Sequence, residues 1–448
     1  MDDQRMYTVL PYVEDSSQFV ARLLDLPFPI LLDSCNHNPA GGRYDILSAA
    51  PVATLEVENG KLISSESLPV DISSDLFLAA EELLQRYKPN DGISIPSHVP
   101  FDGGLMGFLG YPTLKPGGSI KIKQAFLGIY VWVLVVDHLQ RESRLLFRSN
   151  CPTVIRRMVA DRLQANATQH AEFELTQKFS NNLSKRDYDK SFQRVKSYIL
   201  AGDCYQVNLT QRFSGRFSGH PFSAYKRLRA LTGKPFSAFL GWQNKFLLCL
   251  SPERFLRVEQ QEVMTQPIKG TRPRSYDPIK DARLAEDLLS SEKERAENLM
   301  IVDLLRNDLG TSCETGSIRV PKLFDLQSYD NVHHLVSTVS GRLPLTISPL
   351  ELFRKCYPGG SVTGAPKLRS MEIIEEIENT KREVYCGNVL YLGFNGHMDS
   401  NITIRSLYCR DNEIYSWAGG GIVADSECDQ EYRECFDKIS SIISILQG

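Results

Sequence analysis

Several features are absent from this 448-residue chain, and each absence excludes a class of protein. There is no run of basic residues and the formal net charge is −3, so binding to nucleic acid or anionic membranes lacks electrostatic support. The longest apolar run, 129–136, is far shorter than the roughly 20 residues of a membrane-spanning helix. The charged start, residues 1–5, lacks the apolar core of a signal peptide. We therefore expect a cytoplasmic location.

Cysteine pairing is also missing. The ten cysteines are scattered without a Cys-x-x-Cys pair, and Cys428 and Cys435 have no histidine near them at metal-ligand spacing. We interpret all ten as reduced structural thiols rather than as a zinc or redox site.

What is present is typical of a large soluble globular protein. The apolar fraction is 42% and the charged fraction 23%. Residues 1–175 alternate strand-like runs with polar turns, and the polar stretch 164–182 is the best linker candidate. Residues 184–448 interleave strands with long helices, which favours an α+β fold over regular βαβ winding. The elements expected there are helices over 278–307, 365–377 and 429–446, and strands over 385–394 and 401–409.

Lys269 and Glu253 stand out because each follows a strand-like run. Lys269 comes after 262–265 and Glu253 after 245–250, and the two strand–turn units together predict a hairpin. Such a hairpin would place an amine beside a carboxyl, a candidate nucleophile beside a candidate general acid. Taken alone, a lysine at position 269 is more often a surface residue next to a turn.

Eight segments along the chain carry a resemblance when taken in order. They are 203–209, 251–255, 267–271, 295–304, 332–335, 358–367, 402–405 and 418–424. Together they resemble the chorismate-utilising enzymes, which comprise anthranilate, aminodeoxychorismate, isochorismate and salicylate synthases. The first 180 residues match more loosely, through 30–34 and 101–108. The resemblance implies two orthogonally packed antiparallel β-sheets flanked by helices.

Two positions discriminate within the family that the chain resembles. Anthranilate synthases carry alanine where Lys269 stands, and isochorismate and salicylate synthases carry a water-activating lysine where Gln206 stands. The combination here is similar to the aminodeoxychorismate-forming branch, which serves p-aminobenzoate and folate synthesis. An anthranilate synthase component I, or a silent subunit that only activates a glutaminase, are the alternatives.

Two pairs of glutamates repeat the same spacing on two predicted helices. Glu294 and Glu297 form one pair, and Glu431 and Glu434 form the other. Spacing of i,i+3 puts both carboxylates on one helix face, and oxygen ligands without histidine or cysteine suit Mg²⁺. Each pair alone is more often a solvated helix face. The resemblance implies a Mg²⁺ site here, with Glu297 and Glu434 as direct ligands.

Further residues are expected to hold the substrate. A glycine triplet after a strand offers backbone N–H groups to an anion, and Arg405 can form a two-pronged contact with a carboxylate from the alternating run 402–405. The segment 358–364 suggests a turn leading into a helix start, which also suits an oxyanion. The substrate-binding set is Gln206, Thr271, His334, Ser361, Thr363, Gly364, Tyr385, Arg405, Gly419, Gly420, Gly421 and Lys438.

The resemblance also implies a reaction course and a partner. Glu253 would protonate the departing C4 hydroxyl of chorismate while Lys269 attacks C2, and ammonia would then enter at C4 and expel the lysine. Gln206 is neutral and cannot activate water. The chain has no Gly-x-Cys-x-Gly motif, so we expect a separate glutamine amidotransferase subunit to supply ammonia.

A second ligand site is expected from residues of the N-terminal region together with Pro235 and Phe236. Its residues resemble the segments that hold tryptophan in relatives, where glutamate usually stands in place of Asp33. We therefore expect a bound tryptophan to be structural rather than inhibitory. The residues are Leu32, Asp33, Ser34, Arg43, Tyr44, Pro235 and Phe236.

Overall fold

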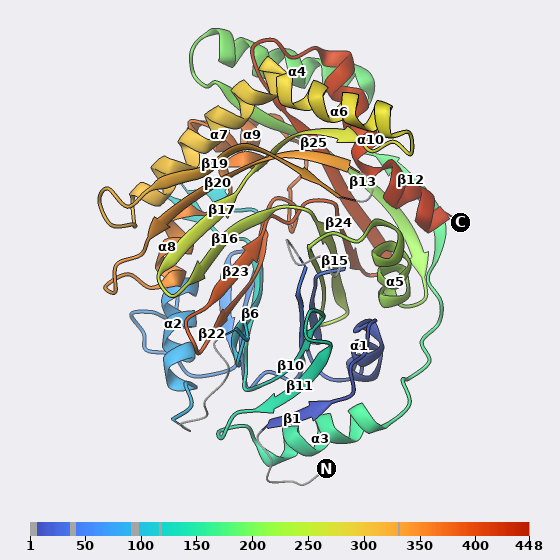
Figure 1. Ribbon diagram of the computed structural model, residues 1–448, viewed down its shortest axis with the longest axis vertical. Helices are drawn as coiled ribbons and strands as arrows, with labels where there is room; N and C mark the ends of the chain where they lie inside the picture. Colours follow the sequence, from blue (N-terminus) through green and yellow to red (C-terminus); the bar gives the residue numbers. More distant parts are fainter. Residues whose placement is uncertain (1–6, 36–41, 91–97, 116–118, 330–331, 448) are drawn as a thin grey trace.

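The computed structural model describes residues 7–35, 42–90, 98–115, 119–329 and 332–447. Residues 1–5, used in the argument against a signal peptide, lie outside this range. Two large antiparallel sheets face each other, and helices cover their outer sides (Figure 1). The α+β expectation is confirmed. None of the helices in the described ranges has the length and hydropathy needed to cross a membrane.

Sheet A has twelve strands within the described residues. In order across the sheet they are β1 (Tyr7–Leu10), β11 (Glu142–Phe147), β10 (Trp132–Asp137), β3 (Tyr44–Ser48), β2 (Ile30–Asp33), β14 (Phe236–Trp242), β15 (Lys245–Ser251), β24 (Ser406–Arg410), β25 (Glu413–Ile422), β13 (Gln206–Ser218) and β12 (Glu174–Asn181), with β21 (Gly364–Ala365) paired to β13.

Sheet B has eleven strands in the part of the chain that the structure describes. They are β18 (Ile268–Pro273), β20 (Val332–Arg342), β17 (Glu262–Gln266), β16 (Arg254–Glu259), β23 (Met398–Asn401), β22 (Asn388–Gly393), β6 (Gly104–Leu109), β9 (Gln124–Tyr130), β4 (Ala53–Glu58) and β5 (Lys61–Ser64), with β19 (Arg319–Ser328) paired to β20. A separate small hairpin joins β7 (Thr113–Leu114) to β8 (Ile120–Lys121).

The helices pack on the sheets and on one another. They are α1 (Ser17–Leu23), α2 (Leu76–Arg86), α3 (Thr153–Gln164), α4 (Lys185–Leu200), α5 (Pro221–Thr232), α6 (Pro278–Ser290), α7 (Glu292–Gly310), α8 (Pro349–Cys356), α9 (Lys367–Ile377) and α10 (Cys428–Gln447), with the 3₁₀ turn η1 (Gly360–Val362). Helix α7 lies on β18 and β20, and α10 lies on β25. Helix α7 therefore packs against sheet B and helix α10 against sheet A (Figure 1).

Strand β10 shows why the sheets form a core. All six of its residues, from Trp132 to Asp137, are buried, because it lies between β3 and β11 and is covered on both faces. One apolar cluster runs through both sheets and includes Phe239 and Leu407 of sheet A and Phe108 and Leu256 of sheet B. Each sheet contains strands from before and after residue 180, so neither sheet is confined to one of the predicted regions. The division into 1–175 and 184–448 stays a prediction. All ten cysteines are free thiols.

Helix α4 has a capping residue at its start and a glycine just after its end. The Ser184 side chain accepts a hydrogen bond from the Asp187 N–H at the helix start, and Gly202, at φ 82°, follows the end. Tyr188, Phe192 and Val195 are its buried residues, at helical spacing.

Three expected elements differ from the structure. The helix predicted over 278–307 is broken at Ser291, whose extended backbone ends α6 and whose hydroxyl accepts a hydrogen bond from the Glu294 N–H to begin α7. The linker predicted over 164–182 contains β12, which pairs with β13 at the edge of sheet A. The strand predicted over 401–409 is divided between sheet B, which it leaves at Asn401, and sheet A, which it enters at Ser406.

The prediction that residues 245–265 form one hairpin was wrong, because its two strands do not pair with each other. Strand β15 belongs to sheet A, whereas β16 and β17 form the hairpin in sheet B. Glu253 lies between β15 and β16, where the chain crosses from one sheet to the other. The crossing, rather than a hairpin turn, therefore positions this carboxyl.

Candidate active site

Glu253 and Lys269 meet through a shared partner, Ser361. The Ser361 hydroxyl donates to Glu253 Oε1 (2.7 Å), and Lys269 Nζ donates to the Ser361 carbonyl (3.4 Å). Glu253 is 5% exposed. Burial raises the pKa of its carboxyl to about 7, although the Ser361 hydrogen bond and the Lys269 charge act in the opposite direction. A carboxyl with this pKa can donate a proton near neutral pH.

A β-bulge sets the position of Lys269. Lys269 pairs with Leu335 and Thr271 pairs with His334, so Gly270 is an extra residue between them. Gly270 has φ 79°, and a Cβ at this position would lie 3.0 Å from a Glu294 carboxylate oxygen. Glycine here therefore allows β18 to approach α7 closely.

His334, on β20, is a neutral polar group beside β18, the strand that carries Lys269. The Thr271 hydroxyl lies 3.0 Å from its Nδ1, and burial lowers the pKa of the imidazole to about 4. At neutral pH the ring can therefore donate one hydrogen bond and accept another. His333 has different partners, since its two ring nitrogens contact Ser328 and Asp281.

The four predicted metal-site glutamates come from α7 and α10. Burial raises the pKa of Glu297 and of Glu431, and neighbouring carboxylates raise both further. Burial also acts to raise the pKa of Glu434, but the Lys438 charge and hydrogen bond outweigh it, and the pKa of Glu434 is lowered overall. A Cβ on Gly420 would lie 2.8 Å from a Glu431 oxygen and 3.8 Å from a Glu434 oxygen, so the glycine triplet lies against these acids.

The carboxylate oxygens of this cluster are the kind of ligand that Mg²⁺ prefers, but the four side chains are not yet arranged around one point. Within the described ranges, no three acidic, histidine or cysteine side chains are grouped closely enough to hold a metal ion. Lys438 forms an ion pair with Glu434, and Arg272 forms one with Glu294 (3.4 Å). A bound cation would have to replace these partners and draw the carboxylates together.

Gln206 supplies a buried amide with no partner. It is fully buried, and neither Nε2 nor Oε1 has a hydrogen-bond partner among the described residues. A Cβ on Gly421 would lie 2.8 Å from the Gln206 Cδ, so the amide lies directly over the glycine triplet. Buried polar groups are normally satisfied, and this amide is therefore suited to a ligand.

Arg405 reaches the site from an irregular segment rather than from the predicted alternating strand. Its φ is 53°, and one guanidinium nitrogen donates to the Lys438 carbonyl (2.9 Å). Burial lowers the pKa of the Arg405 guanidinium, outweighing the nearby Tyr385 and Glu434. A ligand carboxylate would stabilise this cation. Tyr385 is buried and stacks on Trp417, with ring centroids 6.2 Å apart.

The segment predicted as a turn into a helix start is different in the structure. Residues 360–362 form η1, and Gly364 begins β21, which pairs with β13; α9 begins only at Lys367. The Thr363 hydroxyl donates to the Gly359 carbonyl (2.8 Å). A Cβ on Gly364 would lie 2.1 Å from the Gln206 carbonyl oxygen, so only glycine permits this approach.

The chain is similar to known proteins along almost its whole length. The family model for chorismate binding enzymes matches residues 29–444. The chain belongs to the chorismate binding enzyme family.

Similar proteins include three informative members of this family. An aminodeoxychorismate synthase component 1 from Klebsiella aerogenes is 41% identical, with 98% of each chain covered. An anthranilate synthase component 1 from Aquifex aeolicus is 33% identical, with 94% of this chain and 89% of the relative covered. The crystal structure of anthranilate synthase component I from Streptococcus pneumoniae has a TM-score of 0.77 at 29% identity, covering 90% of this chain and 92% of that one.

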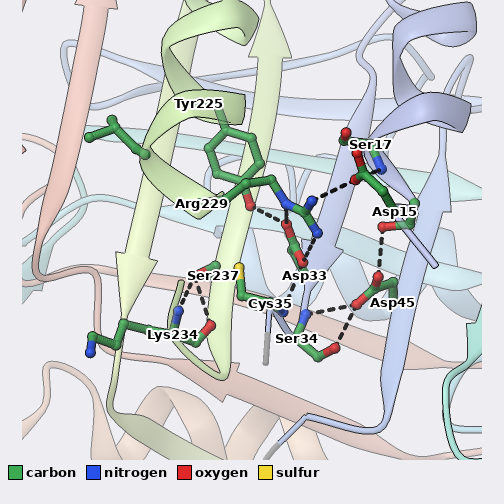
Figure 2. Close-up of polar contacts among 12 residues, drawn as sticks. Asp15, Ser17, Asp33, Ser34, Cys35, Asp45, Tyr225, Arg229, Lys234 and Ser237 are labelled. Atoms are coloured by element: carbon green, nitrogen blue, oxygen red, sulfur yellow. Dashed lines mark hydrogen bonds and ion pairs between the residues drawn. The ribbon is translucent and has the colours of Figure 1, made fainter. Parts of the chain in front are cut away.

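All seven residues predicted for a second ligand site line one cavity of about 360 Å³, and they are Leu32, Asp33, Ser34, Arg43, Tyr44, Pro235 and Phe236. The carboxylate of Asp33 already has partners, as Figure 2 shows. Arg229 donates to both of its oxygens (2.6 and 3.1 Å) and the Tyr225 hydroxyl donates to one (2.8 Å). Tryptophan binding in this cavity stays a prediction.

Two buried polar residues near the site were missed by the sequence reasoning. Asn298 on α7 donates to the Leu335 carbonyl (3.4 Å) and accepts from the Ser337 hydroxyl (2.6 Å), which ties the acidic helix to β20. Arg382 donates to the carbonyls of Val362 (2.9 Å) and Asn208 (2.7 Å). An asparagine within the apolar face of a helix is a local signal for the first, but the second depends on distant contacts.

Proposed function

We propose that the chain converts chorismate and ammonia to 4-amino-4-deoxychorismate, a step toward p-aminobenzoate and folate. The observation that carries the proposal is the contact of Glu253 and Lys269 with the same residue, Ser361. The site thus holds a proton donor beside an amine. The name of the Klebsiella aerogenes relative supports this product.

The chain's own residues provide each part of this reaction. Arg405 and the backbone of Gly419–Gly421 would bind the substrate carboxylates. Glu253 would give its proton to the C4 hydroxyl, which leaves as water, while the Lys269 amine forms a bond to C2 and both ring double bonds shift toward C4. Ammonia would then form a bond to C4, the two double bonds would shift back, and the C2–nitrogen bond to Lys269 would break.

Mg²⁺ is the cofactor that the acidic cluster fits. Glu297 and Glu434 would hold it directly, with Glu294 and Glu431 beside them. When bound, it would neutralise the ring carboxylate of chorismate. Lys438 would then be free of Glu434 and able to contact the substrate.

Ammonia would come from a separate glutamine amidotransferase subunit. The words "component 1" in the relatives' names support a multi-subunit enzyme. The ten free thiols support the cytoplasmic location expected from the sequence.

An anthranilate synthase is the second candidate, since relatives of that name share about a third of the residues. Lys269 argues against it, because a lysine at this position favours a covalent route. The purified chain should be incubated with chorismate, Mg²⁺ and ammonium, and the products resolved by mass spectrometry. We expect 4-amino-4-deoxychorismate; anthranilate as the main product would contradict the proposal.

A further inference from the structure

A second, larger cavity lies behind the segment that carries Ser361 and Thr363. Its volume is about 1020 Å³, and residues of β4, β9, α9 and the β24–β25 turn line it. Tyr111, Glu378 and Arg382 belong to its lining. Nothing in the reaction described so far uses this cavity.

Two side chains of the cavity lining, Tyr111 and Arg382, also contact segments of the candidate active site. The guanidinium of Arg382 lies 4.6 Å from the ring centroid of Tyr111 and donates to the Val362 and Asn208 carbonyls. The Tyr111 hydroxyl lies 3.5 Å from Thr363 Oγ1. Both residues therefore line the cavity on one side and contact the substrate-binding segments on the other.

A row of buried polar groups runs along one face of β13 and β25. Asn208 pairs with Gly421, Thr210 with Gly419 and Arg212 with Trp417, and paired residues of antiparallel strands share a face. Because side chains alternate along a strand, Gln206 lies on the same face as Asn208.

Several of these groups have no partner in the described part of the chain. They are both amide atoms of Gln206, Oδ1 of Asn208 and Nε1 of Trp417, and all three residues are at least nine-tenths buried. Farther along β13 from Gln206, the Thr210 hydroxyl donates to Glu378 in the cavity lining (2.8 Å). Polar groups buried like this are normally satisfied by water or a ligand.

We propose that this row is an inlet through which ammonia moves from the large cavity to Gln206, and that the amidotransferase subunit delivers ammonia at the mouth of the cavity. This inference rests on the proposed function. Ammonia is small and both donates and accepts hydrogen bonds, so it suits the alternating acceptors of Asn208 and Gln206 and the donor of Trp417. The inlet also avoids the acidic cluster, where the Glu434 side chain is 49% exposed to water.

The test is the coupling between glutamine hydrolysis and amination in the complex with a saturating amidotransferase subunit. Thr113 lines the cavity, and Thr113→Trp should block it. Lys115→Trp is the matched control, because Lys115 is exposed on the same segment and does not line the cavity. Asn208→Leu is a second, internal variant that removes the polar side chain from the row at similar size.

The measured quantity is the aminated product formed per glutamate released. We expect both Thr113→Trp and Asn208→Leu to lower this ratio about tenfold relative to Lys115→Trp, while the rate with saturating free ammonium stays at the wild-type level. A ratio at the control value in both variants would overturn the inlet. If the wild-type chain made anthranilate instead, the proposed function would fail, but the ratio would still test the inlet.

Discussion

At the scale of single residues, the burial of Glu253 has a cost in stability that can be measured. Its carboxyl has a pKa of 4.5 in a solvated reference and about 7 in the folded protein. Between these values the folded state holds a proton that the unfolded state has lost, so stability falls as the pH rises from 4.5 to 7 and stays lower above it.

Glu253→Gln should therefore raise the free energy of unfolding at pH 8, by roughly 2–3 kcal/mol, and change it little at pH 4.5. Urea unfolding at both pH values measures the difference. Glu286→Gln, at an exposed position, is the control. An equal effect at both pH values would show that the carboxyl is not destabilised by its burial. The same variant should lose about 100-fold or more in turnover, because it removes the proton donor.

Gln206 should determine which nucleophile is used. Gln206→Lys places an amine where the amide cannot deprotonate water, so we expect some hydroxylated, isochorismate-like product next to the amino product. Product analysis by mass spectrometry checks this, with Gln206→Met as a control of similar size that lacks a base. A folded, chorismate-binding lysine variant that forms only the amino product would show that position 206 does not control the choice.

At the scale of elements, α7 and α10 bring the acidic residues to one place. Glu297→Gln or Glu434→Gln should abolish turnover and leave the circular dichroism spectrum unchanged, because each removes an oxygen ligand of Mg²⁺. Glu292→Gln is the control, since Glu292 is exposed in the first turn of the same helix. Full activity of metal-free protein in EDTA would refute the Mg²⁺ assignment.

Local sequence patterns predicted most of the helices and strands that were expected in residues 184–448. The patterns failed where tertiary contacts decide the course of the backbone. Helical patterning runs without interruption from 278 to 307, but Ser291 satisfies the N-terminus of α7 better as a cap than as part of one long helix. The alternation of 402–405 indicates a strand, yet the chain changes sheets there, and Arg405 takes a left-handed conformation. No local rule anticipates such a crossing.

The candidate site shows the same division between local and distant information. Glu253 and Lys269 could be singled out because each follows a strand and both belong to recognisable segments. Ser361, which joins them, is 108 residues from Glu253, and the bulge at Gly270 depends on the approach of α7. Contacts over such distances are set by the packing of whole elements, which the residue pattern does not encode locally.

At the scale of the whole molecule, the site depends on both sheets. Sheet A contributes Gln206 and the Gly419–Gly421 triplet, and sheet B contributes Lys269 and His334. Glu253 and Arg405 lie where the chain crosses between the sheets. A cut near residue 180 would remove strands from both sheets, so we expect neither fragment to bind chorismate alone. Calorimetric titration of each purified fragment with chorismate checks this, and binding by either one would contradict it.

The central claim is that the Lys269 amine forms a covalent bond to chorismate, and peptide mapping tests it most directly. The protein should be incubated with chorismate and Mg²⁺ without ammonia, then digested and analysed by mass spectrometry. We predict an adduct on Lys269 with the mass of chorismate minus water, its absence in Lys269→Ala, and a loss of amination in that variant of about 10²- to 10⁴-fold, roughly 3–5 kcal/mol of barrier. An adduct on another residue, or undiminished amination by Lys269→Ala, would contradict the account.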